Sequence, residues 1–90
     1  MRVRVRLVSL LREAVGGRQE LELELPGDSA RLGDVVKALY ERYPSLGKLV
    51  RELEDRGLNI VYMVNGQGAS EDAAVRDGDT VTVLPPASGG

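Results

Sequence analysis

Two segments near the N-terminus alternate between charged and apolar side chains. In residues 2–8 arginine alternates with valine and leucine, and in residues 19–25 glutamate alternates with leucine. A period of two residues predicts β-strands with one buried face. The arginine and glutamate rows have opposite charges, and cross-strand pairs contribute roughly 0.2–1 kcal/mol each, so we expect the two strands to be neighbours in a hairpin. This hairpin needs a second layer to cover its apolar face.

The middle of the chain supplies that layer. Apolar residues recur between residues 32 and 43 at the i, i+3, i+4, i+7 spacing of an amphipathic helix. We expect Ser29 to cap the start of this helix and Pro44 to end it. The same spacing over residues 46–53 predicts a second, shorter helix, with Gly57 as its C-terminal cap.

Further strands are predicted in the second half of the chain. Residues 59–65 are apolar on both faces, which is typical of a strand that is central in a sheet or covered by a partner. Residues 69–75 are irregular, with a possible short edge strand. Residues 80–84 alternate again and predict a last strand with Val81 and Val83 facing inward.

This order of elements predicts an α+β fold. A mixed sheet of four to five strands would pack against one main helix plus a short second helix. The 90 residues suffice for one core. We therefore expect a single domain over residues 1–84, followed by a tail over residues 85–90.

The composition excludes several classes of function. The chain contains no cysteine and no histidine, which removes thiol nucleophiles, the usual metal sites and the usual acid–base group of neutral pH. Its net charge of −2 and its aromatic content of 3% argue against a nucleic-acid or membrane-surface binder. No apolar run approaches the roughly 20 residues that span a bilayer, so a cytoplasmic protein is expected.

The C-terminal tail is the segment in which we expect chemistry. Pro85 and Pro86 cannot continue a strand ladder and favour an extended conformation. Beyond Ser88, the side chains of Gly89 and Gly90 are single hydrogen atoms, so this end can thread a channel too narrow for other residues. The carboxylate of Gly90 would be a handle for the active site of another protein, where ATP could activate it as an acyl-adenylate.

A family resemblance strengthens this interpretation. Residues 77–90 combine an Asp-Gly-Asp turn, a valine-rich strand and a Pro-Pro…Gly-Gly ending, and they resemble the end of the small subunits of molybdopterin synthase. These subunits belong to the ubiquitin-like β-grasp sulfur carriers. Other similar features are Leu11-Arg12-Glu13 followed by Gly16, and Val64-Asn65-Gly66.

The resemblance implies a function in molybdenum or tungsten cofactor biosynthesis. An E1-like adenylyltransferase would adenylate Gly90 with ATP, and a sulfur donor would convert it to a thiocarboxylate. The tail, residues 85–90, would then enter the large subunit of molybdopterin synthase and pass sulfur to a pterin precursor. The chain would bind no cofactor or metal, and the catalytic side chains would belong to its partners.

The resemblance also implies a docking surface. Apolar residues on the open face of the sheet bind partners in this family. Val8 and Leu84 match this description on the two strands that a β-grasp fold pairs in parallel, and Met63 or Val61 on the third strand can join them. The arginine row is a weaker candidate, because the glutamate row can neutralise it.

Three alternatives remain open. A thiamine-pathway sulfur carrier has the same fold and ending, although it usually lacks a region such as residues 43–57. A ubiquitin-like protein modifier would use the same activation and join Gly90 to lysines of target proteins. A plain binding module with an inert tail would tolerate truncation of that tail.

Overall fold

The predicted N-terminal hairpin is present. A computed structural model describes residues 1–85. Strands β1 (Arg2–Leu7) and β2 (Glu20–Glu24) pair antiparallel, with Arg4 opposite Glu22. Valine and leucine of both strands are buried, and arginine and glutamate are exposed, as the alternation predicts.

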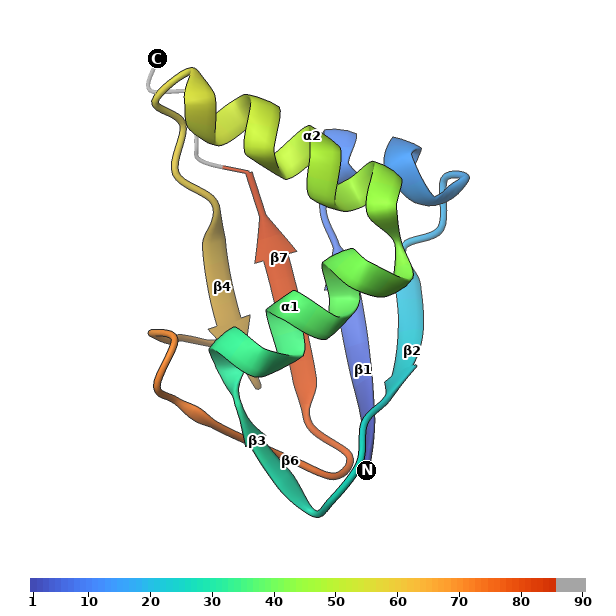
Figure 1. Cartoon of the computed structure of the whole chain (residues 1–90), viewed down its shortest axis with the longest axis vertical. Helices are drawn as coiled ribbons and strands as arrows, with labels where there is room; N and C mark the ends of the chain where they lie inside the picture. Colours follow the sequence, from blue (N-terminus) through green and yellow to red (C-terminus); the bar gives the residue numbers. More distant parts are fainter. Residues whose placement is uncertain (86–90) are drawn as a thin grey trace.

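Three further strands extend this hairpin into a five-stranded mixed sheet. Strand β7 (Thr80–Leu84) lies parallel to β1, and β4 (Val61–Val64) pairs antiparallel with β7. The two-residue strand β5 (Gln67–Gly68) completes the order β2-β1-β7-β4-β5. The apolar strand β4 is therefore next to the last in the sheet rather than central. β1 and β7 run in the same direction, and their C-terminal ends lie at the end of the sheet where β4 begins (Figure 1).

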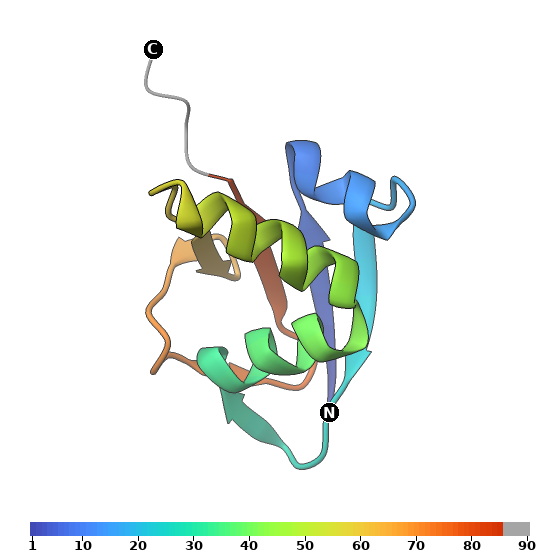
Figure 2. The ribbon, with the colours of Figure 1, turned by 45° about the horizontal axis from the view of Figure 1, so that its top comes forward.

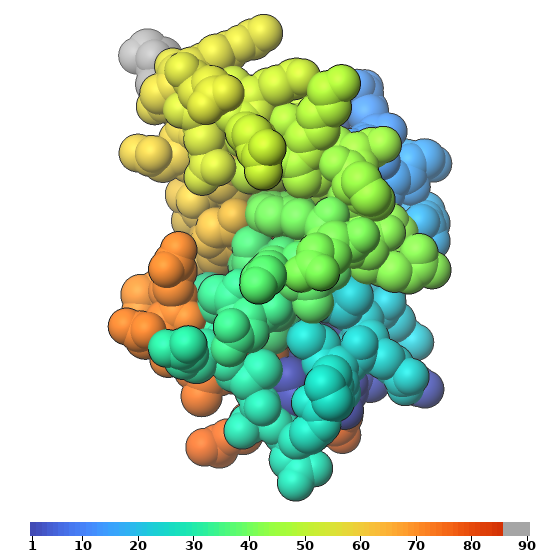
Figure 3. All heavy atoms as spheres, viewed as in Figure 1, coloured from blue at the N-terminus to red at the C-terminus, as the bar shows by residue number. Residues whose placement is uncertain are grey.

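Helices cover one face of the sheet. Helix α1 (Leu32–Arg42) and helix α2 (Pro44–Asp55) cross the strands on the same side, and the 3-10 helix η1 (Ser9–Val15) links β1 to β2 (Figures 1 and 2). In the space-filling view, atoms of α1 and α2 spread over this face (Figure 3). Thus only the opposite face of the sheet is open to a partner.

The second helix is longer than expected. It has 12 residues against 11 in α1, because Pro44 not only follows the end of α1 but also occupies the first turn of α2, where its missing N–H costs nothing. Gly57 ends α2 as predicted, with φ of +83° and with the Leu58 N–H donating to the Leu53 carbonyl at 3.0 Å. Gly47 allows close packing, since a Cβ there would lie 2.9 Å from the Cβ of Tyr40 on α1.

The expectation that Ser29 caps α1 is wrong. Ser29 begins the short strand β3 (Ser29–Arg31), which pairs with β6 (Ala74–Arg76) in a separate two-stranded sheet. Backbone carbonyls from the loop before β6 take over the capping: the Leu32 N–H donates to Ala73 at 2.8 Å, and the Gly33 N–H donates to Glu71 at 3.0 Å. These acceptors satisfy two of the four free amides at the start of the helix, and no side-chain cap is present.

The core lies between the sheet and the helices and is almost wholly aliphatic. Val5, Leu39 and Val83 are fully buried, and among the described residues no charged or polar side chain is buried. At its margin, the hydroxyl groups of Tyr40 on α1 and Tyr62 on β4 are 2.7 Å apart. Burial raises the pKa of Tyr40 above its ordinary value, and the hydrogen bond with Tyr62 adds to this shift. Burial likewise raises the pKa of Tyr62.

Candidate functional site: the open sheet face and the C-terminal tail

The open face of the sheet consists of the side chains that alternate with the core residues. On β7, Val81 and Val83 are fully buried, so Thr80, Thr82 and Leu84 point to the other face. The strand register shows which residues of the neighbouring strands belong to this face. Leu84 lies opposite Val61, and Thr82 lies opposite both Arg6 and Met63. Residues paired in register share a face, which places the arginine row beside the threonines.

One end of this face is apolar. We call Val8, Val61, Met63 and Leu84 the apolar patch. Val61 is 46% exposed and Val8 is 36% exposed, whereas Met63 and Leu84 are half-buried. Val8 directly follows β1, and its N–H donates to the Val83 carbonyl at 3.3 Å, which holds it beside Leu84. The structure thus brings together the residues that the sequence singles out for partner binding.

Leu10 is an exposed apolar residue that the sequence analysis did not select. It lies on η1, two residues after Val8, and is 40% exposed while the next residue, Leu11, is fully buried. The sequence offers one indication of this exposure. Leu10 and Leu11 are adjacent, and two adjacent residues of a helix cannot both face the core. Ser9, the first residue of η1, follows Val8 directly. Its φ of +58° is a left-handed backbone conformation that is uncommon for serine.

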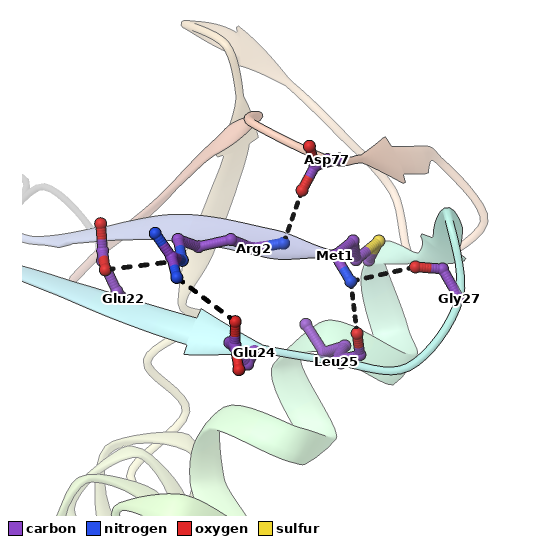
Figure 4. A network of polar contacts seen from close by, with 7 residues as sticks. All are labelled: Met1, Arg2, Glu22, Glu24, Leu25, Gly27 and Asp77. Atoms are coloured by element: carbon purple, nitrogen blue, oxygen red, sulfur yellow. Dashed lines mark hydrogen bonds and ion pairs between the residues drawn. The ribbon is translucent and has the colours of Figure 1, made fainter.

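The other end of the face is charged and largely paired. Arg2 is 3.5 Å from Glu24 and 3.8 Å from Glu22, and Arg4 is 3.1 Å from Glu20 (Figure 4 shows the contacts of Arg2). We call these two arginines and three glutamates the charged half. The predicted cross-strand pairing is therefore confirmed for Arg2 and Arg4. These side chains are more than half exposed, so each ion pair contributes at most about 1 kcal/mol.

The third arginine of the row differs from the other two. Arg6 lies opposite Glu20 in the register, but Glu20 contacts Arg4, which is its diagonal neighbour. Within residues 1–85, no ion pair or side-chain hydrogen bond includes Arg6. It is exposed, and it stands on the same strand face as Val8, two residues along the chain. Hence Arg6 is an unpaired cation at the border between the charged half and the apolar patch.

The Asp-Gly-Asp turn lies at the opposite end of β7 from the apolar patch and is a structural element. Asp77 accepts a hydrogen bond from the Arg2 N–H at 2.7 Å, and the Gly78 N–H donates to the Arg2 carbonyl at 2.8 Å. The N-terminal ammonium group of Met1 donates to Leu25 and Gly27 nearby (Figure 4). These contacts tie the start of β1 to β2 and to the turn before β7, and they occupy the Arg2 amide and two of the three N–H groups of the Met1 ammonium.

Asp79 extends this network to the turn after β4. It accepts hydrogen bonds from the Arg76 N–H at 2.8 Å and from the Asn65 side-chain amide at 3.1 Å. The Asn65 side-chain oxygen in turn accepts from the Thr80 N–H at 3.0 Å. The Arg76 N–H, followed by the Asn65 amide, holds the pKa of Asp79 below its usual value. These bonds fix β7 between β1 and β4, which sets the position of Leu84 at its far end.

The tail begins at the apolar patch. β7 ends at Leu84, and Pro85, which is half-buried, belongs to no strand. The other predicted tail residues, Pro86, Ser88, Gly89 and Gly90, lie outside the described residues. Because Pro85 follows Leu84 directly, a protein that contacts Leu84 is also close to the root of the tail.

The sequence matches the model of a known protein family. The match is to the ThiS family and covers residues 5–90. The chain belongs to the ThiS family. This family comprises ubiquitin-like β-grasp proteins that serve as sulfur carriers or modifiers and are not catalysts themselves. The predicted fold class is therefore confirmed, and so is the resemblance to the sulfur carriers.

Individual relatives of this chain carry two kinds of name, modifier protein and molybdopterin converting factor. Small archaeal modifier protein 1 of Haloferax volcanii is 34% identical over 84% of this chain and 87% of its own length. Small archaeal modifier protein 3 of the same organism is 32% identical over the full length of both chains. A putative molybdopterin converting factor subunit 1 from Pyrococcus furiosus has a solved structure with a TM-score of 0.68 and 29% identity, covering 96% of this chain and 98% of that one.

Within residues 1–85, no helix is both long enough and apolar enough to cross a bilayer.

Proposed function

We propose that this member of the ThiS family is a sulfur carrier for molybdopterin synthesis and that Gly90 is its reacting residue. The observation that carries the proposal is the continuity of Leu84 and Pro85: β7, the strand that contributes Leu84 to the apolar patch, is also the strand that the Gly-Gly tail follows in the sequence. A partner bound to the patch is therefore supplied with the tail at the same time.

The proposed chemistry proceeds in two steps on Gly90. An E1-like adenylyltransferase joins the Gly90 carboxylate to the α-phosphate of ATP and releases pyrophosphate. Hydrosulfide delivered by a sulfur donor then attacks the carbonyl carbon, AMP leaves, and Gly90 carries a thiocarboxylate. In the large subunit of molybdopterin synthase, the sulfur of the thiocarboxylate passes to a pterin precursor.

The division of labour between carrier and partners follows from the side chains present. The sequence has no cysteine to hold sulfur and no histidine to transfer protons near neutral pH. The group that we assign to the acyl chemistry is the carboxylate of Gly90. The role of residues 1–85 is to bind the partner and to bring the tail to it.

A protein modifier is the second candidate, and the curated relatives favour it. Both are named small archaeal modifier proteins, and one of them aligns over the full length of this chain. In this function the Gly90 acyl-adenylate would be attacked by a lysine amine of a target protein, with AMP as the leaving group. The activation step and the docking surface would be the same in both functions, and only the acceptor would differ.

Deletion of Gly90 tests the shared step. Adenylation is measured as carrier-dependent exchange of pyrophosphate into ATP by the adenylyltransferase from the same cells. The deletion moves the carboxylate back by about 3.5 Å, and a displacement of even 1 Å in an active site can cost about a hundredfold in rate, so we expect the exchange to be lost. Glu41→Ala, at an exposed position of α1, leaves the tail unaltered and serves as the control, with exchange near that of the unaltered protein. Near-normal exchange by the deletion variant would refute the proposal.

A further inference from the structure

We propose that Arg6 is a specificity-determining residue of the docking surface and that it pairs with a carboxylate of the adenylyltransferase. This inference rests on the proposed function and adds to it the chemistry of the partner surface. The enzyme must present an apolar surface to the apolar patch and an aspartate or glutamate beside it, in front of Arg6.

The first argument is the offset of the ion pairs in the charged half. Three arginines face three glutamates in register, so full pairing would be possible. Two of the observed contacts are diagonal, Arg4 with Glu20 and Arg2 with Glu22, while Arg2 also contacts its register partner Glu24. This arrangement uses all three acids and leaves Arg6 as the cation of the row without an ion pair within residues 1–85.

The second argument is the position of Arg6 relative to the apolar patch. Its register partner is Thr82 on β7, and the next residues along the same face are Val8 and Leu84. Two residues of a strand span roughly 7 Å, so the guanidinium group is within reach of a protein that covers the patch. Such a cover removes water from Arg6, and a cation that loses water without gaining an acceptor is costly. A partner without an acidic group at this place is therefore disfavoured.

The third argument is the length of the tail, which favours the enzyme that holds the nucleotide as the partner. Gly90 is the fifth residue after Pro85. A segment of this length spans at most about 18 Å. The site that activates Gly90 must lie within that distance of the docked Pro85, which favours one protein that both binds ATP and covers the patch and Arg6.

Charge reversal at Arg6 tests the proposal, and Arg2 offers a matched control. Arg6→Glu and Arg2→Glu change the net charge equally and lie on the same strand face, but Arg2 is at the far end from the apolar patch. Binding of each variant to the adenylyltransferase is measured by calorimetry, and pyrophosphate exchange gives KM and kcat. Thermal unfolding verifies that each variant is folded.

We expect Arg6→Glu to weaken binding and raise KM by at least about tenfold, with kcat unchanged. We expect Arg2→Glu to change both by less than about twofold, because exposed charges outside an interface act mainly through screened, long-range forces. Arg6→Ala should lie between the unaltered protein and Arg6→Glu. Equal effects of Arg6→Glu and Arg2→Glu, or no effect of either, would overturn the proposal.

The outcome is separable from that of the proposed function. If the unaltered protein binds the enzyme but supports no exchange that depends on Gly90, the proposed function fails. The calorimetric difference between Arg6→Glu and Arg2→Glu still decides whether Arg6 contacts the partner.

Discussion

The charged half and the apolar patch of the open sheet face differ in whether their side chains pair with each other. In the charged half, arginines of β1 and glutamates of β2 pair with each other, so this surface is satisfied without a partner. In the apolar patch, Val8 and Val61 remain exposed although they lie on the same sheet. The difference teaches that alternation alone does not identify a docking site. We expect the docking site in the part of the face whose side chains find no partner within residues 1–85.

The largest expected effect is that of a charge in the apolar patch. Leu84→Asp places a carboxylate where a partner would exclude water, which should cost about 2 kcal/mol of binding or more, equivalent to about thirtyfold in Kd. Thr80→Asp is the matched control, because it changes the same face of the same strand beside the charged half. Calorimetry with the adenylyltransferase measures both Kd values. Similar losses for the two variants would contradict the division of the face into two parts.

A smaller effect is expected from the tyrosine pair beneath the patch. Burial raises the pKa values of Tyr40 and Tyr62, whereas an unfolded tyrosine loses its proton near pH 10. Above about pH 10 the unfolded chain loses protons that the folded chain keeps, so the free energy of unfolding should fall as the pH rises, and should be insensitive to these groups below that pH. The variant with Tyr40→Phe and Tyr62→Phe should show a shallower fall. Denaturant unfolding between pH 8 and pH 11 checks this, and identical slopes would show that the pair does not titrate as described.

The smallest effect is expected in the charged half. Glu20→Gln removes the ion pair with Arg4, and both side chains of this pair are more than half exposed. We expect the free energy of unfolding to drop by about 0.5 kcal/mol or less at low salt and by less at high salt, with no change in Kd for the partner. Denaturant unfolding at two salt concentrations measures the first quantity. A loss of partner binding would place the charged half inside the docking surface.

The sequence was sufficient for features that depend on local periodicity. Alternation identified β1, β2 and the buried face of β7, because side chains of a strand change face at every residue. It also placed Val8 and Leu84 on the open face, since each interrupts an otherwise polar row. The helical spacing located α1 and α2 for the same reason, with a period of 3.6 residues.

Features set by contacts between distant segments could not be predicted in this way. The amides at the start of α1 bond to carbonyls of Glu71 and Ala73, about 40 residues away, so Ser29 was free to join a strand. The unpaired state of Arg6 depends on which of two glutamates Arg4 contacts, and sequence spacing does not decide between a direct and a diagonal partner. The contact between Tyr40 and Tyr62 likewise follows from helix packing rather than from any local pattern.

The intact mass of the protein, purified from its native cells with an untagged C-terminus, tests the central claim most directly. The sulfur-carrier account predicts a fraction that is heavier by the exchange of one oxygen for one sulfur, with the change located at Gly90. An unmodified mass accompanied by high-mass conjugates would assign the chain to the protein modifiers instead. An unmodified mass without conjugates, and without any response to ATP and the adenylyltransferase, would contradict the account.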